Sequence, residues 1–161
     1  MMIVDSQVHI WGANTPERPW PARQSVKAQR DIPLGKDELL REMDAASVNR
    51  VVIVPPSWEG ERNDLAIAAA QAHPNRFAIM GRINPELPES RGKIAAWRKQ
   101  PGMLGVRFVF HRSPLLELLT EGKADWLWPE AEKHGVPVYM LVPHRHLHFV
   151  DRIAERHPGL K

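Results

Sequence analysis

The chain has 161 residues, and its 22 Lys and Arg against 19 Asp and Glu give a formal net charge of +3 at pH 7. Its 43% hydrophobic and 25% charged residues are typical of a soluble globular protein and exclude disordered, collagen-like and coiled-coil classes. The small, scattered positive surplus gives no nucleic-acid footprint. Because the chain has no cysteine, thiolate nucleophiles and iron–sulfur clusters are excluded, and any metal ion must use His, carboxylate or amide ligands.

The N-terminal segment MMIVDSQVHIW is not a secretory signal. It has no positively charged start, and Asp5 and His9 interrupt its apolar stretch. No run approaches the roughly 18 apolar residues that a membrane helix needs. We therefore expect a cytoplasmic protein.

Short apolar runs rich in β-branched residues predict five strands, and apolar residues at helical spacing predict helices between them. The strands are expected at residues 2–10, 50–54, 76–83, 102–110 and 136–142, and the helices at 36–46, 63–72, 90–99, 115–119, 125–133 and 147–156. This alternation predicts a parallel sheet with helical crossovers in a single domain, residues 1–161. A proline-rich loop, residues 12–33, follows the first strand. Asn63 is placed to cap the helix expected at 63–72.

Two of these strands are polar on one face. In the first, Asp5, Gln7, His9 and Trp11 alternate with apolar residues, and in the fourth Arg107 and His111 alternate with valine and phenylalanine. A parallel strand covered by helices on both faces would be apolar throughout, so the pattern indicates the interior of a barrel that opens into a site. Sites in parallel α/β folds lie at the C-terminal strand ends, where we expect these side chains to converge: His9, Trp11, Trp58, Arg82, Asn84, His111 and His144.

The segment 3–11 resembles the first-strand signature of the amidohydrolase superfamily, in the amidohydrolase-related branch of lactonases and decarboxylases, whose usual form is Asp-x-His-x-His. The resemblance covers most of the chain and continues through residues 51–57, 63–64, 73–77, 105–107 and 149–159. It implies a (β/α)8 TIM barrel that hydrolyses small esters, lactones or amides. It also implies a zinc-type ion at the C-terminal strand ends in many members.

Three departures from the family pattern bear on the function. Gln7 stands where the first metal-binding His would be, which leaves His9 as the second, and an amide oxygen is a poorer zinc ligand than imidazole. The fifth strand lacks the His of many metal-dependent members, as in lactonases that need no metal. The chain stops at Lys161, before a sixth strand that would carry a His and an eighth that would carry a catalytic Asp. Since a TIM barrel needs about 250 residues, we expect only the first five βα units here.

The candidate catalytic residues are His9 and Gln7. His9 is a metal ligand or an acid–base group, with a hydrogen-bonded structural His as the alternative. Gln7 replaces a metal ligand, or orients His9 or a substrate carbonyl. Arg107 clamps a substrate carboxylate, or forms a buried ion pair, for example with Asp5.

The other candidates would bind substrate. Arg82, His111 and His144 lie near strand ends, and Trp11, Trp20 and Trp58 would form an apolar substrate wall. The spacing of His144, His146 and His148 is that of a metal site on an extended segment, but the helix expected at 147–156 separates His146 from the other two.

These residues support three hypotheses. In the first, water attacks the carbonyl of a lactone, ester or amide, with a divalent metal such as zinc or without one. The second is a non-oxidative decarboxylase of the same fold, which needs a tightly held metal. The third is a catalytically degenerate barrel that only binds a ligand. In each, the expected partner is a small molecule rather than a nucleic acid or a membrane, and homo-oligomerisation is left open.

Overall fold

The computed structural model describes residues 1–22 and 28–161. The predicted loop at 12–33 includes residues 23–27, which lie outside the described residues; elsewhere in the loop, Thr15 and Arg18 form an isolated antiparallel bridge. The chain divides into two compact units: unit 1 is Met1–Arg82 with Pro101–Met103, and unit 2 is Ile83–Gln100 with Leu104–Lys161. The single domain therefore stays a prediction.

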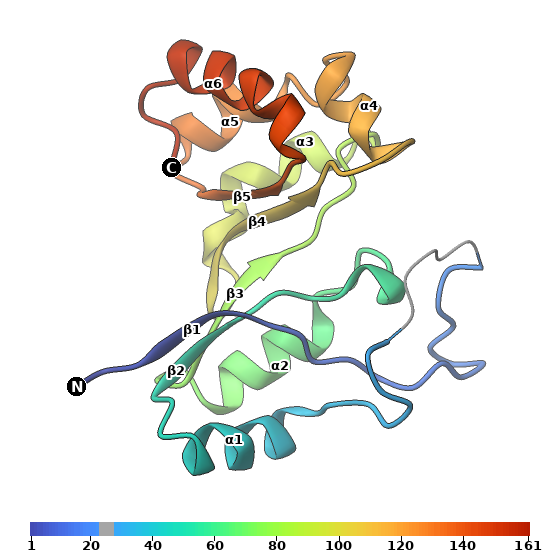
Figure 1. Cartoon of the computed structure of the whole chain (residues 1–161), viewed down its shortest axis with the longest axis vertical. Coiled ribbons are helices and arrows are strands. Elements are labelled where there is room, and N and C mark those ends of the chain that lie inside the picture. The colour runs from blue at the N-terminus through green and yellow to red at the C-terminus, as the bar shows by residue number, and fades with distance from the viewer. Residues whose placement is uncertain (23–27) are drawn as a thin grey trace. The chain divides into compact units, whose positions relative to one another are not determined.

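The five predicted strands are confirmed, each slightly shorter than expected. They form one sheet in the order β1-β2-β3-β4-β5 (Figure 1), and the pairs β1–β2, β2–β3 and β4–β5 are parallel. Their bounds are β1 Val4–Val8, β2 Arg50–Ile53, β3 Phe77–Gly81, β4 Met103–Val109 and β5 Val138–Leu141.

The six predicted helical segments are also confirmed, with one correction. Residues 90–99 form a short α-helix continued by a 3-10 helix, η2, rather than one α-helix. The 3-10 helices η1 and η3 follow Pro56 and Pro143, and three residues are too few to show helical periodicity in the sequence. The helices are α1 Lys36–Ala45, α2 Asp64–Ala72, α3 Ser90–Lys93, α4 Leu115–Thr120, α5 Leu127–Lys133, α6 Leu147–Arg156, η1 Ser57–Glu59, η2 Ile94–Lys99 and η3 His144–His146. None of the described helices is long and apolar enough to cross a membrane.

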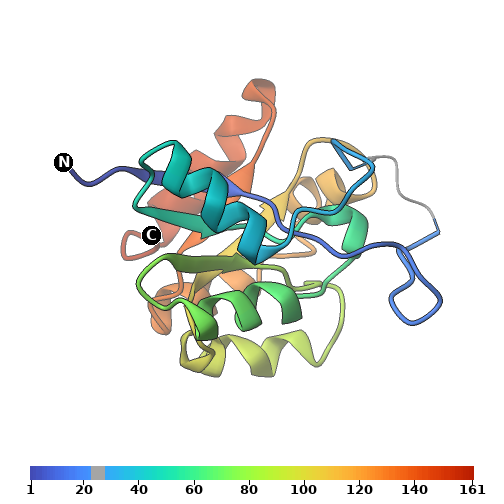
Figure 2. The same ribbon diagram turned by 90° about the horizontal axis from the view of Figure 1, so that it is seen from below.

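The strands of unit 1 bury two apolar faces. One face carries Ile53 beside Ile79 and is covered by α2. Gly102, in the turn before β4, lies so close to α2 that an added Cβ would overlap the Cβ of Ala70. The small side chains of α2 allow this approach. Figures 1 and 2 show α1 and α2 on the same side of these strands. The opposite face carries a buried cluster of Val52, Val54 and Met80.

In unit 2, β4 has the two faces predicted from its sequence. Phe108 and Phe110 stack with ring centroids 5.5 Å apart, and Phe110 meets Trp128 of α5 edge-on at 6.4 Å. On the other face Arg107 lies beside Tyr139, which is 37% exposed. The apolar face of β4 is therefore packed against α5.

The C-terminal turn of unit 2 is held by Glu132 of α5. Its carboxylate accepts a hydrogen bond from the Gly159 backbone N–H at 2.7 Å and lies 3.1 Å from Nδ1 of His157. The turn brings the Lys161 carbonyl within 2.8 Å of the Val138 N–H at the start of β5. The chain thus begins to pair with β5 directly after this turn.

We expect Glu132→Gln to lower the thermal unfolding temperature near neutral pH and to lose this effect in acid. The Gly159 N–H, followed by the His157 side chain, lowers the pKa of the Glu132 carboxyl below its ordinary value of 4.5. The carboxylate therefore stabilises the fold above the unfolded-state pKa, and this contribution disappears as the pH falls through the lower folded-state pKa. Melting curves of both proteins between about pH 6 and pH 3 measure this, with Glu130→Gln on the same helix as the control. Equal unfolding temperatures at pH 6 would contradict it.

Candidate functional site

A β-bulge in β1 decides which way the first-strand residues point. Asp5 pairs with Val51 and Val8 pairs with Ile53, so β1 has one more residue than β2 between these pairs. Asp5 and Val8 therefore share one face, and His9 turns to the other. The expectation that Asp5 and His9 share a polar face is wrong, because the bulge interrupts the alternation. Gln7 lies exposed in this bulge, and its backbone N–H donates to Oδ1 of Asp5 at 3.0 Å.

The His9 ring has a defined orientation and tautomer. Its Nδ1 lies 2.6 Å from the Val54 carbonyl oxygen at the end of β2. A carbonyl oxygen only accepts hydrogen bonds, so Nδ1 carries the hydrogen, and in the neutral ring the lone pair is on Nε2. Nε2 is thus the atom of His9 that can accept a proton or bind a metal ion.

Three tryptophans gather beside His9 and form an aromatic cluster. The Trp58 ring meets the His9 ring edge-on at 5.6 Å and the Trp11 ring edge-on at 5.6 Å, and Trp20 lies 6.5 Å from Trp58. Trp11 and Trp58 are buried, and the Trp58 indole N–H has no hydrogen-bond acceptor among the described residues. The cluster puts aromatic surface next to His9, and its role as a substrate wall stays a prediction.

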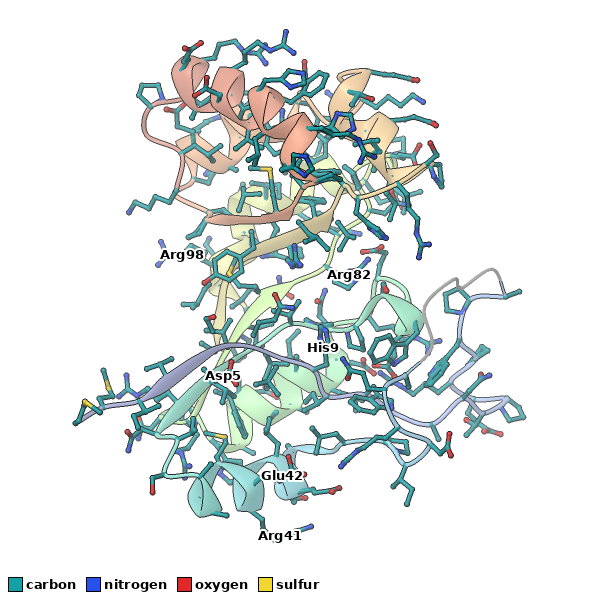
Figure 3. All side chains as sticks on the ribbon, viewed as in Figure 1. Asp5, His9, Arg41, Glu42, Arg82 and Arg98 are labelled. Carbon is teal, nitrogen blue, oxygen red and sulfur yellow. The ribbon has the colours of Figure 1, made fainter. Side chains whose placement is uncertain are left out.

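Arg82 follows β3 two residues after Met80, so it continues the face of the Val52, Val54 and Met80 cluster. Its Nε donates to the Gly60 carbonyl at 2.9 Å, and one terminal nitrogen lies 3.4 Å from the Glu61 carboxylate. Figure 3 shows Arg82 and His9 on the same side of the strands. Unit 1 therefore brings an imidazole and a guanidinium together at its C-terminal strand ends.

Asn63 holds the backbone of Arg82. The Asn63 amide oxygen accepts from the Arg82 N–H at 2.8 Å, and its amide nitrogen donates to the Arg82 carbonyl at 2.9 Å. Asn63 does occupy the position before α2, but its side chain makes no capping hydrogen bond there. The predicted capping role is wrong because the amide is taken by the neighbouring strand end.

We expect Asn63→Ala to lower the free energy of unfolding by about 2 kcal/mol, because two hydrogen bonds are lost and the Arg82 backbone groups lose their partner. Chemical denaturation measures the change. Asn75→Ala, in an exposed turn, is the control and should cost under about 0.5 kcal/mol. A loss at Asn63 no larger than at Asn75 would show that the amide does not hold the strand end.

The remaining candidates lie in unit 2. Arg107 is 8% exposed, and its guanidinium donates to the Phe108 carbonyl at 2.7 Å. His111 follows β4; burial, and then the charge of Arg112, lower its pKa. His144 is exposed at the start of η3. Since the candidates are divided between the two units, their convergence on one rim stays a prediction.

The histidines after β5 do not form a metal site. The helix predicted at 147–156 is α6, and His146 lies before it in η3. Nε2 of His146 accepts a hydrogen bond from Nε of Arg145 at 3.1 Å, and Nδ1 of His148 lies 3.1 Å from the Arg145 carbonyl. Burial, then the charge of Arg145, lower the pKa of His146.

The described residues do not by themselves make a metal centre. Among residues 1–22 and 28–161, no three His, Cys, Asp or Glu side chains are placed to hold a metal ion. His9 offers one imidazole nitrogen, and Gln7 replaces the neighbouring histidine, whereas catalytic zinc ordinarily takes three protein ligands.

Sequence reasoning missed Glu59, a buried carboxylate next to Trp58, and its partner Arg18. Glu59 is buried and Arg18 is half-buried, and both lie in short segments without periodicity, so their contact has no signal in the sequence.

Solved structures share this fold. A probable 2-pyrone-4,6-dicarboxylic acid hydrolase from Acinetobacter baumannii, with citric acid bound, superposes with a TM-score of 0.74 at 17% identity, over 96% of this chain and 55% of that one. An amidohydrolase from Burkholderia multivorans with bound zinc gives 0.70 at 19% identity, over 99% and 55%. A 2,6-dihydroxybenzoate decarboxylase from Rhizobium gives 0.67 at 18% identity, over 100% and 65%.

The chain thus spans about 55% of the length of the first two proteins, and no curated protein matches it. The predicted fold, the first five βα units of a TIM barrel, is confirmed by the five strands in chain order and by these superpositions. The amidohydrolase family profile matches residues 4–161, which include β1 with His9 and every later strand. On this match the chain belongs to the amidohydrolase family.

Proposed function

We propose that the protein is a hydrolase of a small carbonyl compound, a lactone, ester or amide, in which water attacks the carbonyl at the C-terminal strand ends. The observation that carries this proposal is the orientation of His9. Its Nδ1–H donates to the Val54 carbonyl, so Nε2 is left to act on water or substrate. A fixed imidazole at a strand end is suited to proton transfer near neutral pH.

In this reaction His9 accepts a hydrogen bond from the attacking water through Nε2 and so positions the water. The guanidinium of Arg82, at the end of β3, binds an anionic group of the substrate, since guanidinium recognises carboxylates through paired hydrogen bonds. Arg107 stays a predicted substrate-binding residue. Gln7, exposed in the bulge two residues before His9, offers an amide to the substrate carbonyl. The carbonyl–oxygen or carbonyl–nitrogen bond breaks as the water oxygen bonds to the carbonyl carbon. The departing alcohol or amine takes up one proton of the water, and the acid that is formed loses the other to give a carboxylate.

The similar proteins favour an anionic lactone as the substrate. A 2-pyrone-4,6-dicarboxylic acid is a cyclic ester with two carboxylates, and the hydrolase from Acinetobacter baumannii acts on that compound according to its name. In unit 1 the buried Arg82 fits such a charged substrate, and the aromatic cluster beside His9 fits a flat ring.

A second candidate is non-oxidative decarboxylation, favoured by the likeness to 2,6-dihydroxybenzoate decarboxylase. That reaction needs a tightly held metal ion, and Gln7 in place of a histidine weighs against it. A barrel that binds its ligand without turnover is the third candidate. The cytoplasm as compartment, and metal dependence itself, stay predictions.

The test uses protein expressed from the complete natural gene. Its metal content is measured, and it is incubated with lactones that include 2-pyrone-4,6-dicarboxylate, with simple esters and amides, and with 2,6-dihydroxybenzoate. Proton release in a pH-stat with ring-opened product by mass supports the hydrolase. Release of carbon dioxide instead would establish the decarboxylase, and saturable binding without product would establish the binding barrel.

A further inference from the structure

Glu59 is a buried carboxylate that accepts hydrogen bonds from the segment that follows β1. Its side chain is 2% exposed. Oε1 accepts from the Gly12 backbone N–H at 2.9 Å and from Nε of Arg18 at 2.7 Å, and Oε2 accepts from a terminal nitrogen of Arg18 at 3.2 Å. Arg18 also forms a paired contact with Asp64, at 2.6 and 2.9 Å, where the Asp64 side chain is 60% exposed.

This buried ion pair is not explained by stability alone. Removing a carboxylate from water costs several kcal/mol, and well-packed apolar side chains often serve as well or better. What the pair supplies is geometry, because a guanidinium and a carboxylate meet in a fixed, planar arrangement. Gly12 supports this explanation, since a Cβ at Gly12 would lie 2.7 Å from Arg18 and 3.4 Å from Glu59. Only glycine lets the three groups approach so closely.

The groups that the pair fixes lie directly beside His9. Glu59 follows Trp58 in the chain, and Gly12 follows Trp11, so the hydrogen bond that the Gly12 N–H donates to Glu59 joins the backbone next to both tryptophans, whose rings meet edge-on. The Trp58 ring in turn contacts the His9 ring edge-on. The Val54 carbonyl contacts the imidazole at Nδ1, and Trp58 contacts its ring.

We propose that Glu59 is a positioning residue for His9, which acts through Trp58 to aim Nε2 of the imidazole at the reacting water. Arg18 and the Gly12 N–H hold the Glu59 carboxylate in place for this purpose. The inference rests on the hydrolysis proposed above for its effect on turnover. Its effect on the His9 ring itself does not depend on which reaction the protein catalyses.

The test is Glu59→Gln compared with Asp64→Asn. Glutamine keeps the size of the side chain but faces an Arg18 N–H with its own amide N–H, so the buried contact is disturbed. Asp64→Asn changes the exposed carboxylate that pairs with Arg18 and leaves the buried contact between Arg18 and Glu59 intact. The ring-nitrogen chemical shifts of His9 are measured by NMR on protein labelled with ¹⁵N-histidine. His9 is one of eight histidines, and its signals are assigned with His9→Asn.

We expect Glu59→Gln to shift the His9 ring signals and to lower kcat/KM by about 10- to 100-fold, as small misplacements of reacting groups do. Asp64→Asn should change neither. Unchanged His9 signals in folded Glu59→Gln would overturn the proposal and leave Glu59 a purely structural residue.

A second variant covers failure to fold. If Glu59→Gln does not fold, the test uses Glu59→Asp, which keeps the charge but is shorter by one methylene. The proposal expects this variant to shift the His9 ring signals, and unchanged signals would overturn it. If the unmodified protein turns over no substrate while Glu59→Gln still shifts the His9 signals, the positioning contact stands and the proposed hydrolysis fails.

Discussion

Replacement of His9 by asparagine is expected to lower kcat/KM for the hydrolysed substrate by about 10²- to 10⁴-fold and to leave the fold intact. The amide nitrogen of asparagine stands close to the place of Nδ1, so it can keep the hydrogen bond to the Val54 carbonyl. It has no atom at the place of Nε2. The substitution therefore removes the atom that positions water while it keeps the contact that holds the side chain.

His9→Gln and His9→Ala complete the comparison. The glutamine amide reaches the place of Nε2 but leaves the Val54 carbonyl without its donor, and alanine removes both groups. We expect both to lose activity as His9→Asn does, with lower thermal stability than His9→Asn. Initial rates on the substrate identified above, together with melting curves, measure this. Full activity in His9→Asn would contradict the proposed function. Activity that is retained in His9→Asn but lost in His9→Gln and His9→Ala would contradict it as well.

Element positions were predictable because each is recorded in a local pattern. In β2, Val51, Val52 and Ile53 are β-branched and apolar, and the helix Leu147–Arg156 places apolar residues at helical spacing, so both elements were located to within one or two residues. The order of strands and helices then predicts a parallel sheet in chain order. In β4 the sequence also predicted which way the side chains point, because its alternation correctly assigns Arg107 and Phe108 to opposite faces.

The direction of the site residues was less predictable, because a single inserted residue reverses a strand pattern. The bulge between Asp5 and Val8 separates Asp5 from His9, and nothing in the sequence of β1 marks it. Asn63 fails as a cap for a related reason. Its amide bonds to the Arg82 backbone, which is distant in sequence and adjacent only in the fold.

The aromatic cluster and the ion pair show a further limit. Trp58 and Glu59 lie in a three-residue 3-10 helix that has no periodicity, and their partners, Trp11 and Arg18, are more than forty residues away. Such contacts depend on which strand ends meet, and a strand order alone does not specify them. His9 was found because its residue type and strand position agree, whereas Glu59 was missed because only its burial distinguishes it.

Gly102→Ala is expected to destabilise unit 1 by about 3 kcal/mol. Gly102 has φ of +69°, a conformation that costs other residues about 1–2 kcal/mol. An added Cβ would also lie 2.4 Å from the Cβ of Ala70 on α2, and such overpacking costs about 1–3 kcal/mol more. The position precedes β4 and lies against α2, so neither element can move without disturbing the other.

Three further variants separate these costs. Gly135 has φ of +60°, but a Cβ there would find its nearest neighbour at 3.8 Å, so Gly135→Ala measures the backbone strain alone. Ala70→Gly removes the Cβ that the new methyl group of Gly102→Ala would overlap. The double variant should therefore regain the stability lost to overpacking but not the stability lost to backbone strain at position 102. Free energies of unfolding from denaturant titrations give all four values. If Gly102→Ala lowers the free energy of unfolding by no more than Gly135→Ala does, the added methyl group meets no resistance from Ala70. That result would show that α2 does not pack closely against this turn.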